Sequence, residues 1–196
     1  MVKKKRPEGT AARQAHLLES AIAVVGKGGL RGLTHRAVDR AADLPEGTCS
    51  VYFRTRLALL TALTGFVAQR LTDDVRRMGE SLPDPSIDPA AAIEATVEMV
   101  VRWSGHPALL ITMTDLHLES VRTPSLRATS DAWRDGLVEV VEGVLQRIEE
   151  KEDPRKRALS IVASVEGVAL SALTMPTRER KTFLRDTLTM VISNLV

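Results

Sequence analysis

Apolar residues recur every three or four positions along this chain, in segments that proline and glycine separate. This spacing places apolar side chains on one face of an α-helix, whereas a strand would alternate them. The first apolar face comprises Leu17, Leu18, Ala21, Ile22 and Val25. We expect the glycines of residues 26–29 to end that helix, since glycine accepts the left-handed conformation of a C-cap. Strand-like alternation is found nowhere in the sequence, which predicts an all-α fold of about nine helices.

Side chains that can begin a helix stand at the start of several of these segments. Thr34, Thr55, Asp88 and Asp153 each carry an oxygen that can accept a hydrogen bond from a backbone N–H of the first turn. Proline follows both aspartates and fits the first position of a helix. Three prolines in residues 81–89 predict a linker, so we place a domain boundary there or slightly before.

Charge is distributed unevenly along the chain. Residues 1–57 hold eleven Lys and Arg against five Asp and Glu, a local charge of +6 within a chain of net charge +2. A basic N-terminal part on a mildly acidic body is typical of contact with a polyanion such as nucleic acid. The basic residues 3–6 fit a phosphate ridge or the minor groove, and a solvated tail is the equal alternative.

The number of cysteines and the hydropathy of the chain indicate its cellular location and whether it carries catalytic or metal-binding residues. A single cysteine, Cys49, excludes an internal disulfide and fits a reducing compartment. No segment approaches the roughly 20 apolar residues of a membrane span, and no apolar run follows the basic N-terminus. We therefore expect a cytoplasmic protein with no membrane partner. Because Cys49 and the four histidines lack motif partners, we expect no enzyme, metal or cofactor; a small helical enzyme would need a catalytic constellation.

The most informative segment is residues 33–60, which read LTHRAVDRAADLPEGTCSVYFRTRLALL. The pattern predicts two short helices joined by a tight turn, with the second at about residues 46–53. Outward side chains of this second helix are small or polar, so its backbone can approach base edges in the DNA major groove. Val51 fits a thymine methyl, and the hydroxyls of Thr34 and Tyr52 fit phosphate oxygens. The flanking phosphate contacts would be Arg36, Arg54 and Arg56.

Several features of this segment occur together and in a fixed order. They are Leu33-Thr34, Val38 and Ala41, Leu44, Gly47-Thr48, Tyr52-Phe53, Arg54, Arg56 and Leu59-Leu60. With them, the chain resembles the DNA-binding domain of the TetR (tetracycline repressor) family of bacterial regulators over about residues 10–65. Asp43 departs from the family pattern, which usually has glycine in the turn, and Ser50 replaces a frequent aromatic residue. Aspartate tolerates the left-handed conformation, so we expect the turn to be kept.

The resemblance implies an architecture and a function. Residues 1–56 would form an N-terminal arm and a three-helix helix-turn-helix DNA-binding domain, residues 57–80 a connecting helix, and residues 81–196 a helical bundle for ligand binding and dimerisation. The protein would be a homodimeric repressor, released from a palindromic double-stranded DNA operator by a small-molecule effector. An activator, a regulator without a ligand and a helical interaction protein without a DNA role stay open. The implied DNA contacts are Thr34, Arg36, Glu46, Gly47, Thr48, Ser50, Tyr52 and Arg56.

The C-terminal half is expected to supply the effector site and the dimer interface. Polar or polarisable groups on apolar helix faces are candidate ligand contacts, with ordinary core packing as the alternative. These candidates are Met99, Trp103, Met113, His117 and Trp133. Residues 158–173 are apolar on nearly all sides and rich in small residues, which suits a four-helix dimer interface completed by the last helix. Its candidate residues are Val162, Glu166, Leu170, Leu184 and Leu188, and a core within one chain is the alternative.

Overall fold

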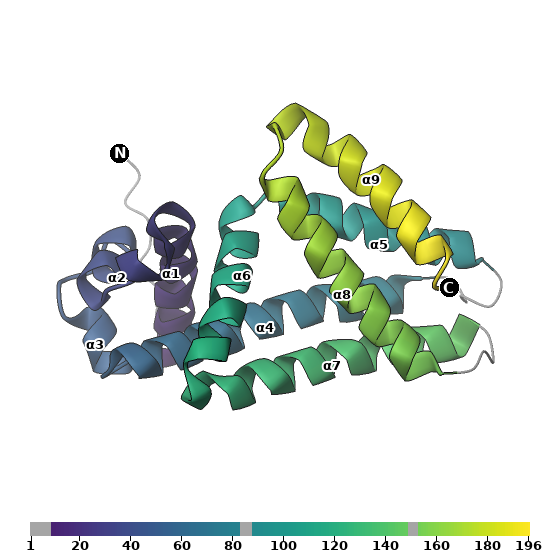
Figure 1. Cartoon of the computed structure of the whole chain (residues 1–196). Helices are drawn as coiled ribbons and strands as arrows, with labels where there is room; N and C mark the ends of the chain where they lie inside the picture. Colours follow the sequence, from purple (N-terminus) through teal and green to yellow (C-terminus); the bar gives the residue numbers. More distant parts are fainter. Residues whose placement is uncertain (1–8, 83–87, 149–152) are drawn as a thin grey trace.

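The computed structural model of the chain describes residues 9–82, 88–148 and 153–196, and the basic residues 3–6 lie outside these ranges. The described residues form helices and no strand, which confirms the all-α prediction (Figure 1). The nine helices in this part of the chain are α1 (Thr10–Gly32), α2 (His35–Ala41), α3 (Thr48–Tyr52), α4 (Arg56–Ser81), α5 (Pro89–Ser104), α6 (Pro107–Arg122), α7 (Pro124–Ile148), α8 (Pro154–Leu173) and α9 (Thr177–Ser193).

The first three helices gather at one end of the molecule (Figure 1). Their apolar faces meet in a small core that includes Leu17, Leu33, Val38, Cys49 and Phe53. A helix as short as α3 is not stable alone, so its position depends on the residues packed beneath it.

The remaining helices form a bundle in which α4 and α7 run side by side and α8 packs against α7 and α9 (Figure 1). The long helix α4 begins beside α3 and continues into this bundle, so one rigid element belongs to both parts. A second connection is made by α6, which packs along α1. No helix formed by the described residues combines the length and the apolar character that a membrane span requires.

Three of the four expected helix caps are confirmed. The side-chain oxygens of Thr34, Thr55 and Asp88 accept hydrogen bonds from the N–H groups of Ala37, Ala58 and Ala91, at 3.1, 3.0 and 3.2 Å. The expectation for Asp153 was wrong. Its backbone is left-handed, with φ 59°, and its side chain makes no capping bond among the described residues.

Two further local features lie in the N-terminal helices. The helical backbone of the first helix is interrupted at Gly29, within the expected residues 26–29, where φ is 61°, and a short helical stretch beyond this kink completes α1 at Gly32. Near the end of α2, Ala41 is exposed, whereas the next residue, Ala42, is buried. The buried residues within α2 are Val38 and an acidic side chain, Asp39.

Candidate DNA-binding surface and ligand cavity

Asp39 fixes the position of α3. Its carboxylate is fully buried and accepts two hydrogen bonds, from the Gly47 N–H at 2.8 Å and from the Cys49 N–H at 2.7 Å. These two N–H groups stand at the start of α3, where an acidic acceptor also matches the positive end of the helix. Asp39 therefore joins α2 to the first turn of α3. Sequence reasoning missed it, and the available signal was an acidic residue directly beside the buried Val38.

The turn between α2 and α3 bends through two residues in the left-handed region. Asp43 has φ 53° and Gly47 has φ 93°. The expectation that Asp43 takes this conformation is confirmed. The Leu44 N–H donates to the carbonyl of Asp39 at 3.0 Å, which closes the turn. Asp39 is thus bonded through both its backbone and its side chain to the connection that aims α3.

The outer face of α3 and of the turn before it is open to solvent. Glu46, Gly47 and Ser50 are exposed, and Val51 is 73% exposed. Thr48 is half-buried, and its hydroxyl donates to the Pro45 carbonyl at 2.6 Å. Apart from Glu46, these side chains are small or short, so they would let the helix backbone come close to the base edges in a DNA major groove.

Other predicted contact residues surround this face. Thr34 and Arg36 are exposed at the start of α2, and Arg36 lies 4.0 Å from Glu46 in an exposed, weak ion pair. Tyr52 is half-buried and packs against the domain core. The guanidinium of Arg56 donates to the carbonyls of Leu33 and Leu30, the latter at 2.6 Å.

Arg56 and two histidines hold the backbone of the domain together. Arg56 binds carbonyls at the end of α1, so part of its donor capacity is used inside the protein. The Nε2–H of His35 donates to the carbonyl of Phe53 at 2.5 Å, and that of His16 donates to the carbonyl of Ala42 at 2.9 Å. Each of these bonds ties the end of one helix to another element, and the sequence carried no motif for either histidine.

Cys49 is buried beneath α3. Burial raises the pKa of its thiol to about 11, and the nearby charge of Asp39 acts in the same direction. The thiol therefore stays protonated at neutral pH, and the thiolate is the reactive form. This supports a packing role for Cys49.

A cavity lies inside the C-terminal bundle and is lined from α4 to α9. Four of the five candidate ligand contacts line it, namely Met99, Trp103, Met113 and Trp133. Nearly all the other lining residues are apolar. They are Leu71, Val75, Met78, Ala92, Ile93, Thr96, Leu137, Val141, Val144, Leu145, Ile161, Val162, Val165, Glu166, Ile192 and Val196.

The fifth candidate, His117, is not among the lining residues. Its ring stacks on the ring of Trp133, with centroids 4.3 Å apart and planes at 28°. Burial and, to a smaller extent, the nearby charge of Arg134 together lower the pKa of His117 to about 4, so the ring is neutral at pH 7. His117 therefore supports one wall of the cavity from behind.

Glu166 and the indole N–H of Trp103 distinguish this cavity from an ordinary apolar core. Burial raises the pKa of Glu166, while the nearby positive charge of Arg134 opposes that rise. The indole N–H of Trp103 donates to Asp74 on α4 at 2.9 Å. Trp103 is therefore held in orientation from outside the cavity.

A family model for the tetracyclin repressor-like C-terminal domain matches residues 87–194, which is more than half of the chain. This chain belongs to the TetR family of transcriptional regulators. No curated protein matches it significantly.

Solved structures share the complete TetR-family fold. A transcriptional regulator from Rhodococcus sp. Rha1 is 19% identical, and the match covers 93% of this chain and 95% of that one with a TM-score of 0.78. A TetR-family member from Streptomyces coelicolor A3 is 25% identical over 92% of this chain and 98% of that one, with a TM-score of 0.67. The multidrug binding protein EbrR, in complex with ethidium, is 25% identical over 94% and 98%, with a TM-score of 0.66.

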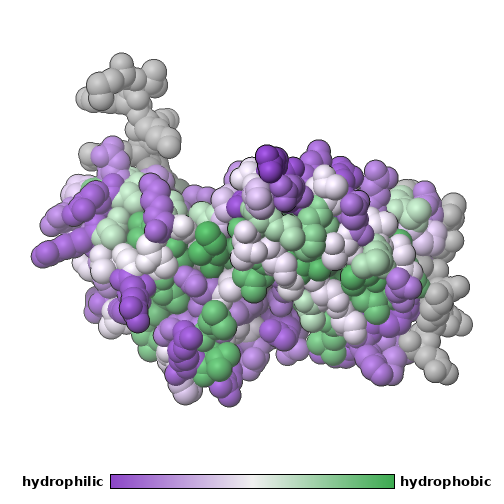
Figure 2. All heavy atoms as spheres, turned by 45° about the horizontal axis from the view of Figure 1, so that its top comes forward, coloured by the Kyte–Doolittle hydropathy of each residue, from purple (hydrophilic) through white to green (hydrophobic). Residues whose placement is uncertain are grey.

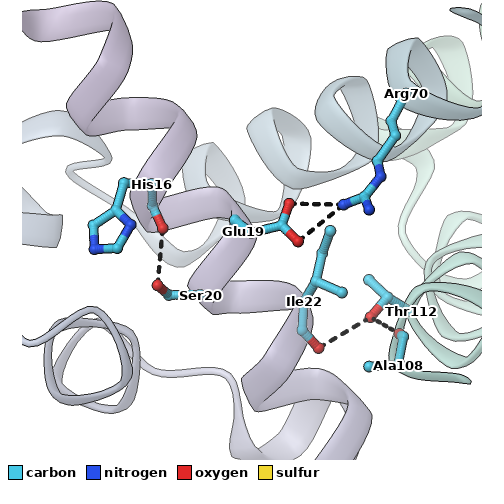
Figure 3. A network of polar contacts seen from close by, with 7 residues as sticks. All are labelled: His16, Glu19, Ser20, Ile22, Arg70, Ala108 and Thr112. Carbon is cyan, nitrogen blue, oxygen red and sulfur yellow. Dashed lines mark hydrogen bonds and ion pairs between the residues drawn. The ribbon is translucent and has the colours of Figure 1, made fainter. Parts of the chain in front are cut away.

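In this TetR-family regulator, α1 is joined to the bundle by a small polar network (Figure 3). The hydroxyl of Thr112 on α6 donates to the Ala108 carbonyl at 2.7 Å and lies 3.5 Å from the Ile22 carbonyl on α1. Glu19 on α1 forms an ion pair with Arg70 on α4 at 2.7 Å. Both α6 and α4 therefore hold α1 in place through polar contacts.

Gly26 allows α1 to approach α6 closely. A Cβ atom at this position would lie only 2.8 Å from the Cα atom of Ala108, so no larger residue fits without a shift. Met113, the residue after Thr112, lines the cavity on the same helix α6. A single helix thus contacts both the cavity and the DNA-binding part.

The predicted dimer residues lie in three different environments. Leu184 and Leu188 are fully buried in the core of their own chain, which fits the alternative of a core within one chain. Val162 and Glu166 line the cavity, and Val162 is also buried. Only Leu170 among the five is exposed, at 45%.

The surface of α8 and α9 carries other large apolar side chains. Leu159 is 42% exposed and Met190 is 62% exposed, in addition to Leu170. Figure 2 shows apolar patches that interrupt the polar surface on the side where α8 and α9 come forward. Leu159 and Met190 are thus exposed apolar residues of α8 and α9 that the sequence analysis did not name.

Proposed function

We propose that this TetR-family regulator is a repressor that binds a near-palindromic DNA operator as a homodimer and is released by a small molecule in the cavity. The observation that carries the DNA-binding part is the exposed face of α3, with Ser50 and Val51 outward and Asp39 fixing the first turn from below. A helix of this kind can enter the major groove and read base edges there.

DNA recognition would divide between positioning and reading contacts. Arg36 and the hydroxyls of Thr34 and Tyr52 suit phosphate oxygens, because they border the exposed face. Ser50 and Val51 suit base edges, because they project from it. Arg56 uses some of its N–H donors in bonds to α1, and its remaining donors would bind DNA. It would therefore both stabilise the DNA-binding domain and contact the operator.

A homodimer would present two copies of α3, one to each half of a symmetric operator. The exposed apolar side chains Leu159, Leu170 and Met190 on α8 and α9 support pairing through these two helices. Two recognition helices about 34 Å apart would then lie in successive major grooves of an inverted repeat. We also infer a cytoplasmic location, in keeping with the single, buried and reduced Cys49.

Release by an effector would act through α6. This helix presents Met113 to the cavity and Thr112 and Ala108 to α1, so a ligand that displaces α6 also moves the DNA-binding part. The ligand changes DNA binding only if it prefers the released arrangement of the subunits. A hundredfold preference corresponds to about 2.7 kcal/mol of coupling. EbrR, which has this fold and binds ethidium, supports an effector role for the cavity.

The test begins with selection of bound duplexes from a random DNA pool, using the full chain. We expect enrichment of an inverted repeat whose binding weakens steeply with salt. Ser50→Glu places a negative charge on the outer face of α3 and should abolish binding, whereas Ala128→Glu, at an exposed position of α7, should not. A pool without an inverted repeat, or equal binding by the two variants, would contradict the proposal.

A further inference from the structure

The lining of the cavity contains one unusual residue. Among the described residues that line it, Glu166 has the only ionisable side chain, and the walls around it are apolar. Glu166 is half-buried and makes no hydrogen bond or ion pair with any residue that the structure describes. Such a carboxylate is poorly solvated, since apolar walls offer it no donor.

We propose that the cavity takes a flat aromatic cation and that Glu166 is its counter-ion. This inference rests on the proposed function, because it names the chemical class of the effector. A bound cation would give the carboxylate the partner that it lacks. Arg134 is the other charged group that acts on Glu166, but it is exposed and does not line the cavity.

The aromatic walls favour the same ligand. Trp103 and Trp133 line the cavity, and the faces of indole rings attract cations. Both rings are held in place, Trp103 by its bond to Asp74 and Trp133 by its stack on His117. An anion is excluded by Glu166, and a neutral apolar molecule would bury the carboxylate without compensation.

Methionines complete a site for a planar ring. Met78, Met99 and Met113 all line the cavity. Their thioether sulfurs are polarisable and adapt to the edges of aromatic rings of different shape. The site would therefore select ligands for positive charge and planarity more strongly than for one particular ring shape.

The experiment compares two probes of nearly equal shape at pH 8, with the full-length protein and no DNA. The probes are the 10-methylacridinium cation and acridine, which is uncharged at this pH. By calorimetry or ligand fluorescence, we expect the wild type to bind the cation about tenfold or more tightly than acridine. Glu166→Gln should weaken binding of the cation by about ten- to hundredfold, the range for losing a charged partner. It should leave acridine binding within about twofold, since dispersion contacts with the ring are unchanged.

Glu139→Gln is the matched control, because Glu139 is exposed on α7 and does not line the cavity. It changes the net charge equally and should leave both affinities unchanged. Equal binding of the two probes by the wild type, equal weakening of both by Glu166→Gln, or binding of neither would overturn the proposal. These results leave the DNA selection intact, and a failed selection leaves the probe affinities intact, so the two proposals fail separately.

Discussion

Asp39→Ala tests how the DNA-binding surface is held. The substitution removes the acceptor of the Gly47 and Cys49 N–H groups, which now bond to it at 2.8 and 2.7 Å. The Cys49 N–H is buried and would be left without a partner, at a cost of about 1–3 kcal/mol. Water can reach the Gly47 N–H, so its loss should cost about 0.5–1.5 kcal/mol. The variant no longer carries the desolvation cost of the buried carboxylate, which offsets part of this loss. We therefore expect the free energy of unfolding to fall by about 2–3 kcal/mol.

The stability change is measured by thermal unfolding, where about 2–3 kcal/mol corresponds to a fall in Tm of about 5–10 °C for a chain of this size. Affinity for the selected operator should fall more than tenfold at a temperature where the variant is folded, because the first turn of α3 is released. Asp39→Asn keeps one acceptor oxygen, so its stability and its operator affinity should lie between those of the wild type and Asp39→Ala.

Asp88→Ala is the control, since Asp88 also caps a helix but lies at the start of α5. It should lose about 1 kcal/mol and leave operator affinity unchanged. If Asp39→Ala is no less stable than Asp88→Ala, or binds the operator like the wild type, then Asp39 does not position α3 and the reasoning fails.

Three further predictions concern other contacts. Gly26→Ala should lose about 1–3 kcal/mol of stability, because its Cβ would crowd Ala108, whereas Gly28→Ala, in open space on the same helix, should gain about 0.5–1 kcal/mol; denaturant unfolding measures both, and equal changes would refute the crowding. The pKa of His117 is about 4 in the folded chain against an ordinary 6.5, so the unfolded chain binds this proton first and stability falls as pH drops from 6.5 to 4. Partial exposure of the ring limits the loss to about 1–2 kcal/mol, and His117→Phe should remove that part of the pH profile, whereas a profile that superimposes on the wild type would exclude it. Arg56→Ala should lose about 1–2 kcal/mol through its bonds to the Leu30 and Leu33 carbonyls, while the exposed Arg54→Ala changes stability by less than about 0.5 kcal/mol; similar stability of the two would show that those bonds contribute nothing.

Features that depend on neighbouring residues were predictable from the sequence. The caps at Thr34, Thr55 and Asp88 need only a side-chain oxygen and a helix that begins next to it. Asp153 carries the same signal but takes a left-handed backbone, which prevents the cap. The helix-turn-helix was visible for the same local reason, since its turn and its small outward residues are contiguous in the chain.

Features that depend on which helices meet were not predictable. Apolar spacing identified Leu184 and Leu188 as buried but could not say whether the partner surface belongs to the same chain. The sequence did not indicate that Asp39 is buried and bonded, because its two donors come from the following turn and helix. Glu166 was expected at an interface, and only the packing of α8 against the bundle places it at the cavity.

The central claim is that the exposed face of α3 lies against base pairs, and a DNA-cleaving tag at Val51 tests it most directly. Val51→Cys is accessible because Val51 is 73% exposed, whereas the native Cys49 is buried with a protonated thiol. With an iron chelate on this cysteine, we expect two clusters of cleavage in the selected operator, about one helical turn apart and symmetric about its centre. Uniform cleavage, or the same pattern from a tag at Ala128→Cys on α7, would contradict the account.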